Sequence, residues 1–268
     1  MFRAKLSVVC AWSLTGATLL LTGCSSVPED KTASWSPNKI YAEAKDEMNS
    51  GGYDKAVSLY EKLEGRAAGT PLAQQAQLDK AYAHYKSGEA AQALATLDRF
   101  MKLHPASPAL DYALYLKGII NFNDDLGLFS ALTRQDLAER DQKAAKESFE
   151  SFKELVARFP TSRYAPDAGL RMTYIVNSLA QYEVHVARYY FARGAFVASI
   201  NRAQITVSDY PGVPAVEEAL FIIFKSYDAL GIAPLRDDAK RVLEKNYPQS
   251  EYLTRGFKGS SDPWWKVW

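Results

Sequence analysis

The stretch AYAHYKSGEAAQALATLDRFMKLHP, residues 81–105, decides the fold class. Two small side chains, Ala81 and Ala93, lie on either side of Gly88, and Pro105 closes the stretch. Antiparallel helices that cross closely need small side chains at the crossing. A glycine allows the chain to turn between two helices, and a proline cannot continue the second one. The stretch therefore predicts a helical hairpin.

The same pattern recurs along the chain. Pairs of small residues 12 apart are Ala44/Ala56, Ala81/Ala93 and Ala187/Ser199, and glycine precedes proline by 17 at Gly88/Pro105, Gly194/Pro211 and Gly231/Pro248. A hairpin repeated at this period resembles the tetratricopeptide repeat, which has two helices per unit. We found no alternating apolar run of useful length. The sequence thus predicts an all-α protein, an α-solenoid of about five tetratricopeptide-like helix pairs.

The repeats are expected between residues 38 and 250. Their approximate bounds are 38–68, 74–106, 111–160, 164–211 and 214–249, and the third carries an insertion at 123–142 between its helices. The fourth opens with a long helix, because apolar residues from Ala168 to Tyr190 recur every three or four positions. The fifth is degenerate, with Phe224 and Arg236 where small residues belong, as terminal capping units often are.

The first residues predict a secreted, lipid-modified protein. Arg3 and Lys5 precede an apolar stretch, and Leu21-Thr22-Gly23-Cys24 follows. This order is that of a signal peptide, and small residues before a cysteine resemble the bacterial lipobox. The resemblance implies that residues 1–23 are removed and that Cys24 is acylated, whereas the alternative is an ordinary signal peptide with a chance cysteine. By resemblance to sorted bacterial lipoproteins, Ser25 in place of aspartate favours the outer membrane over the inner one.

Residues 24–37 are expected to form the lipid anchor and a flexible tether, because SSVPEDKTASWSP is polar and contains proline. A coil of this length spans on the order of 20 Å. The chain has 32 basic and 31 acidic residues, a formal net charge of +1. Such a balance lacks the basic field that drives nucleic-acid binding.

No residue pattern indicates catalysis. His84, His104 and His185 have no second ligand one helical turn away, so neither a zinc site nor another metal or cofactor is expected. The adjacent acids Asp124 and Asp125 lie in the insertion and indicate a solvated turn. The sequence shows no motif of a nucleophile or a phosphate-binding loop. We therefore expect a protein that is not an enzyme.

A peptide groove is expected along the first helices of the repeats, which line the concave side of such an array. Side chains one turn apart face the groove. The candidate lining residues are Tyr82, Tyr85, Tyr115 and Phe122. The alternative is that these rings pack between repeats.

The last residues, 251–268, are expected to form a C-terminal tail with three indoles at Trp264, Trp265 and Trp268. Indoles bury a large apolar area when they find a partner. We favour docking of residues 258–268, which carry these indoles, on the last repeats, on a partner protein or at the membrane interface, and the alternative is a solvated tail.

Several stretches of the chain, from residue 24 to about 250, resemble the BamD (ComL) family of outer-membrane assembly lipoproteins. They are LDKAYAHYKSGE (78–89), DRFMKLHPASPALDYALYLKG (98–118), SFKELVARFPTSRYAPDAGLRM (151–172) and LAQYEVHVARYYFARGAFVASINR (179–202). The resemblance implies a scaffold that docks on periplasmic domains of the barrel-forming subunit BamA, in some lineages binds BamC, and helps to receive unfolded outer-membrane proteins. It also implicates Arg202 in the contact with BamA, and the alternative is a surface arginine lying over its own repeat.

The sequence departs from this family at GRAAGTP (65–71), where relatives commonly have an aromatic residue before a proline and another aromatic after it. Substrate-contacting residues are therefore not assigned in this segment. Competing hypotheses are a secretin pilotin or a peptidoglycan-associated adaptor, and the helical shell of a peptidoglycan lytic enzyme. About 20 residues follow the last repeat, too few for a catalytic domain.

Overall fold

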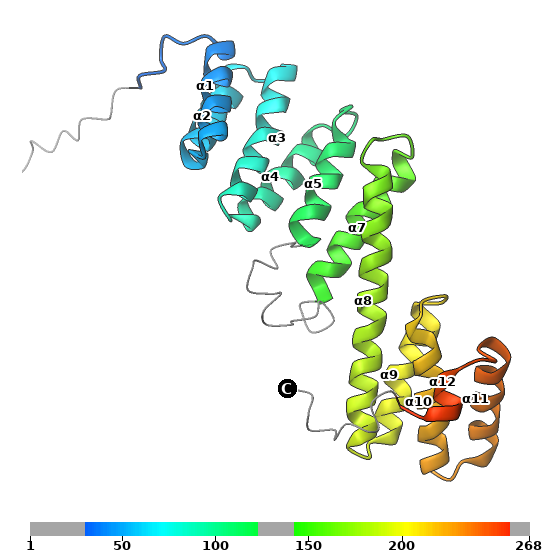
Figure 1. Ribbon diagram of the computed structural model, residues 1–268. Helices are drawn as coiled ribbons and strands as arrows, with labels where there is room; N and C mark the ends of the chain where they lie inside the picture. The colour runs from blue at the N-terminus through cyan, green and yellow to red at the C-terminus, as the bar shows by residue number, and fades with distance from the viewer. Residues whose placement is uncertain (1–29, 123–141, 258–268) are drawn as a thin grey trace, which may run out of the picture.

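A computed structural model describes residues 30–122 and 142–257, and within these ranges the chain is helical with no strand. The helices are α1 (Pro37–Ser50), α2 (Tyr53–Arg66), α3 (Pro71–Lys86), α4 (Ala90–Leu103), α5 (Leu110–Phe122), α7 (Gln142–Arg158), α8 (Ala165–Ala192), α9 (Phe196–Asp209), α10 (Ala215–Ala229), α11 (Ala233–Asn246) and the short α12 (Glu251–Arg255). Successive helices pair as hairpins and stack into an elongated array (Figure 1). The predicted all-α solenoid is confirmed.

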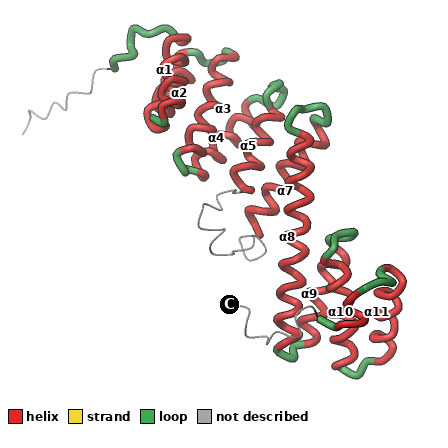
Figure 2. The backbone as a smooth tube through the Cα atoms, in the orientation of Figure 1, coloured by secondary structure: helices red, strands yellow, loops and turns green. Residues whose placement is uncertain are grey.

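Local sequence signals set the helix ends. Ser36 and Thr70 cap α1 and α3 by accepting a hydrogen bond from a backbone N–H three residues ahead, and a proline occupies the first turn of each helix. The loops between the helices of Figure 2 carry glycines in the left-handed region, with φ of +85° at Gly88 and +75° at Gly194. Residues that carry a Cβ rarely adopt this backbone conformation, so such turns favour glycine.

The small residues lie at the helix crossings, as their spacing predicts. Ala81 and Ala93 are fully buried. At the third pair, Ser148 Oγ donates a hydrogen bond to the carbonyl oxygen of Gly118 at 2.8 Å. At the fourth, Ser199 Oγ donates to the carbonyl oxygen of Ala187 at 2.8 Å. A side chain with a single heavy atom beyond Cβ can therefore also satisfy a carbonyl at the point of closest approach.

The long helix expected in the fourth repeat is α8, which has 28 residues. Its first half packs with α7 in an apolar cluster that includes Ala168, Phe152 and Leu155. Its second half packs with α9 and α10 around Val184 and Ala187. One continuous helix therefore belongs to both halves of the array (Figure 1).

The segment before α1 differs from the expected flexible tether. Residues 30–36 fold against α2, where Lys62 Nζ donates to Asp30 Oδ1 at 2.6 Å and Arg66 Nη2 donates to Asp30 Oδ2 at 2.8 Å. Thr32 is 6% exposed, and Trp35 packs against the apolar cluster of the first helix pair. Lys62 and Arg66 lie more than 30 residues from Asp30 along the chain, so local composition could not reveal these contacts.

Candidate functional site

Tyr82 is the candidate groove residue with the most accessible ring. Its exposed fraction is 37%, and its ring centroid lies 6.3 Å from that of Tyr85. Tyr85 itself packs against the cluster that contains Leu97 and Phe100. Tyr82 can therefore contact a ligand directly, whereas Tyr85 supports the surface from beneath.

Tyr115 and Phe122 pack between repeats, the alternative that the sequence left open. The Tyr115 hydroxyl donates to Asp167 Oδ2 at 2.8 Å, and its ring stacks on Tyr164 with centroids 4.7 Å apart. Phe122 lies edge-on to Phe152, with the guanidinium of Arg171 4.8 Å from its ring centroid. Both side chains join α5 to α7 and α8, and their first role is structural.

A buried acid, Asp79, lies three residues before Tyr82 on α3 and accepts hydrogen bonds from two neighbouring side chains. The Tyr41 hydroxyl donates to Asp79 Oδ2 at 2.9 Å, and Gln75 Nε2 donates to Oδ1 at 3.1 Å. Burial, and then the hydrogen bond to Asp79, raise the pKa of Tyr41 to about 12. Tyr41 therefore stays protonated at neutral pH and keeps donating. Sequence reasoning missed Asp79. Its one signal was that this acid directly follows Leu78, a residue that is buried in the structure.

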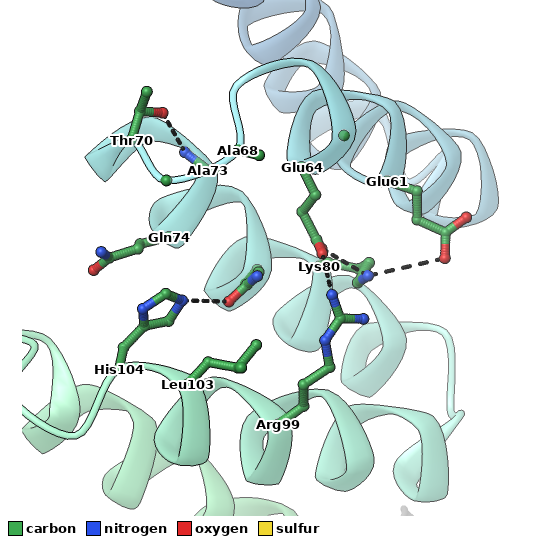
Figure 3. A pocket seen from close by; sticks show the side chains of 13 residues that line it. Glu61, Glu64, Ala68, Thr70, Ala73, Gln74, Lys80, Arg99, Leu103 and His104 are labelled. Carbon is green, nitrogen blue, oxygen red and sulfur yellow. Dashed lines mark hydrogen bonds and ion pairs between the residues drawn. The ribbon is translucent and has the colours of Figure 1, made fainter.

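A pocket of about 550 Å³ opens between α2, α3 and α4 (Figure 3). Lys80, whose side chain is 8% exposed, has its Nζ 2.7 Å from Glu64 Oε1, and Arg99 Nη2 lies 3.4 Å from Glu64 Oε2. His104 Nε2 lies 3.2 Å from Gln77 Oε1 on the opposite wall. The walls thus combine a charge cluster with the apolar side chain of Leu103.

Small residues of the segment GRAAGTP (65–71) form part of the pocket wall. Gly65, Ala68, Gly69 and Thr70 line it, and all belong to the segment 65–71. A Cβ added at Gly65 or Gly69 would meet nothing within 4 Å. Small residues in this segment therefore leave the space open.

Replacing Gly65 by alanine is expected to raise the free energy of unfolding by no more than about 0.5 kcal/mol, because Gly65 lies in the last turn of α2 and glycine is the weaker helix former. Urea unfolding followed by circular dichroism measures the change. A lower midpoint than that of the parent chain would show that the added methyl group meets an obstacle in the pocket wall.

Arg202 on α9 is anchored to a buried acid. Its Nη1 donates to Glu183 Oε2 at 3.1 Å; the Glu183 side chain is 7% exposed and that of Arg202 41%. The guanidinium therefore has one edge on its own repeat and another accessible to solvent. This contact is that of an arginine lying over its own repeat, the alternative that the sequence left open, whereas contact with a partner stays a prediction.

The beginning of the C-terminal tail docks on the last repeats. Phe257 lies between Phe191 of α8 and Phe221 of α10, with centroid distances of 5.1 and 5.0 Å. Tyr252 of α12 donates a hydrogen bond to Glu218 Oε2 at 3.1 Å. Trp264, Trp265 and Trp268 lie outside the described residues, as do Cys24 and positions 123–141 of the insertion.

Two of the three histidines have ordinary partners within the described part of the chain, and His185 is exposed on α8. His84 Nδ1 lies 2.6 Å from Glu89 Oε2 across the α3–α4 turn, and His104 caps α4. In residues 30–122 and 142–257 no group of three His, Cys, Asp or Glu side chains is arranged to hold a metal ion. Across these same ranges, every helix is too short or too polar to span a bilayer.

Comparisons with known proteins show a family. Residues 33–243 match the family model YfiO, described as an outer membrane lipoprotein. The chain is 46% identical over 255 residues to the outer membrane protein assembly factor BamD of Neisseria meningitidis Z2491, covering 93% of this chain and 96% of that protein. It is 35% identical to BamD of Vibrio cholerae, covering 86% and 95%.

Solved structures of more distant proteins are also similar. The type IV pilus biogenesis factor PilW is 17% identical, with a TM-score of 0.35 and coverage of 83% of this chain and 98% of that one. A likeness at this level carries no inference about function.

Proposed function

This chain belongs to the family of outer membrane lipoproteins that includes the BamD assembly factors, and we propose that it is a non-catalytic scaffold of the machinery that inserts β-barrel proteins into the outer membrane. Identity of 46% over 93% of the chain supports this proposal. A role in outer-membrane protein assembly and an association with the outer membrane follow from the family. Affinity purification of the lipidated protein tests the scaffold role, since the barrel-forming subunit should co-purify.

The proposed anchor is an acylated Cys24, which would hold the helical array on the periplasmic face of the outer membrane. The lipobox-like Leu21-Thr22-Gly23-Cys24 supports this anchor, as does the family description. Stable anchoring takes two membrane signals, and an amino-terminal cysteine that carries more than one acyl chain supplies them.

The proposed docking surface for the BamA-like subunit includes Arg202, with BamC as a further partner. Arg202 keeps its outer edge accessible while Glu183 fixes its inner edge. A guanidinium held in this way is pre-oriented for a carboxylate on a partner, because less side-chain freedom is lost on binding.

The proposed receiving surface for unfolded outer-membrane proteins is the part of the expected peptide groove around Tyr82 on α3. Tyr82→Ala is expected to lower photo-crosslinking of an aromatic-ended peptide to α3, because it removes an exposed ring without opening a buried cluster. Val197→Ala is the matched control, since Val197 is also exposed, at 62%, but lies on α9. Crosslinking that is equal in the two variants would contradict this assignment.

A further inference from the structure

Residues 30–36 form a clamp on the first helix pair. Asp30 is bound by Lys62 and Arg66, and Arg66 also donates to the carbonyl oxygen of Thr32. Thr32 is buried, and Trp35 packs on the cluster that contains Ile40 and Leu63. We call these contacts the N-terminal clamp.

The clamp contacts support one another. The Thr32 backbone N–H and hydroxyl both donate to Asp30 Oδ1, at 3.1 and 2.7 Å, and two further backbone hydrogen bonds close turns between Asp30 and Trp35. The hydrogen bonds from Lys62 and then from Thr32 hold the pKa of the Asp30 carboxyl well below its usual range. The carboxylate therefore stays ionised at any pH that the envelope meets.

The clamp changes how far the chain can extend. Six peptide links separate Cys24 from Asp30, and they can span at most about 20 Å. Thirteen links separate Cys24 from Pro37 at the start of α1, and without the clamp they could span about 45 Å. The contacts of residues 30–36 thus remove more than half of the tether's reach.

We propose that the N-terminal clamp shortens the lipid tether and holds the end of α2, where Lys62 and Arg66 bind Asp30, within about 20 Å of the membrane surface. In this proposal, the surface that lies next to the clamp is that of a phospholipid bilayer. Lys39 Nζ lies 4.5 Å from the ring centroid of Trp35 beside the clamp. An indole and an ammonium group side by side suit the boundary between lipid headgroups and water. The inference rests on the proposed acylation of Cys24.

Energy transfer to the membrane tests the proposal. The acylated chain has no cysteine other than Cys24, so Ala42→Cys places a single donor dye on an exposed position of α1. The lipidated protein is inserted in vesicles of phosphatidylcholine and phosphatidylethanolamine that carry an acceptor dye on a headgroup. The clamp is broken by Asp30→Ala with Arg66→Ala, and Asp54→Ala, an exposed acid of α2 outside the clamp, is the matched control.

Energy transfer should be high in the parent and in Asp54→Ala and should fall in the clamp variant. Breaking the clamp raises the greatest length of the free tether, measured from Cys24, from about 20 to about 45 Å. Six Gly/Ser residues inserted before Asp30 lengthen the tether with the clamp intact and should also lower transfer. Equal transfer in the parent and the clamp variant, with a loss in the lengthened chain, overturns the clamp proposal. If even the parent shows no transfer, the acylated anchor itself is wrong.

Discussion

Replacing Gly118 by leucine is expected to lower the free energy of unfolding by about 3 kcal/mol, at the upper end of what an overpacked core costs. A Cβ built on Gly118 would lie 2.4 Å from Cε1 of Phe152, a side chain that is fully buried. The ring has little room to retreat, because Tyr115 and Phe122 pack on it at centroid distances of 6.1 and 6.5 Å. The crossing of α5 and α7 must therefore open.

Urea unfolding followed by circular dichroism measures this effect, and Gly169→Ala is the control. Gly169 also lies inside a helix, α8, but a Cβ there would meet nothing within 4 Å. That variant should be more stable than the parent by about 0.5–1 kcal/mol. Gly118→Ala combined with Phe152→Leu should be more stable than Gly118→Ala alone. If Gly118→Leu unfolds at the parental urea concentration, the close crossing of α5 and α7 is not present in solution.

Arg202→Glu is expected to abolish co-purification of the barrel-forming subunit and also to destabilise the fourth repeat by about 2 kcal/mol. The substitution would leave the Glu183 carboxylate, 7% exposed, beside a second acid instead of a guanidinium. Removing one partner of a fully buried pair costs about 3–5 kcal/mol, and the 41% exposure of Arg202 reduces that figure through solvent screening. A loss of binding in this variant alone would therefore have two explanations.

A second variant separates them. Arg202→Gln with Glu183→Gln removes both charges and leaves two amides that can hydrogen-bond, so the fold should be nearly as stable as the parent by urea unfolding. If docking depends on the arginine, this double variant should still fail to co-purify the subunit. If a stably folded double variant still co-purifies the subunit, the assignment of Arg202 as a partner-binding residue is wrong.

The hairpin pattern could be predicted from the sequence because each crossing needs a residue without bulk, and such residues recur at a fixed spacing. Which aromatic rings are buried and which are exposed could not be predicted from the sequence. Tyr82 and Tyr85 lie one helical turn apart on α3 and were both expected in the groove, yet Tyr85 packs against an apolar cluster. Tyr82 lies one residue after Ala81 and stays 37% exposed. Helical spacing assigns a residue to a face, whereas its depth depends on the neighbouring repeat.

The N-terminal clamp was beyond the reach of the sequence for a different reason. SSVPEDKTASWSP has the polar composition of a linker. What orders its second half is the pairing of Asp30 with Lys62 and Arg66, and no periodicity marks contacts of that kind. Likewise, Glu183 reads as one surface acid among many, and only the packing of α8 against α9 shows that it is buried.

The continuity of α8 has a mechanical consequence. Asp167, which holds the Tyr115 hydroxyl, and Glu183, which holds Arg202, lie on the same helix, 16 residues or about 24 Å apart. A straight helix of this kind resists compression far better than a loop does, so it acts as a strut. The contacts of Tyr115 and of Arg202 are thereby kept at a set spacing, and a force on one end of α8 is transmitted to the other.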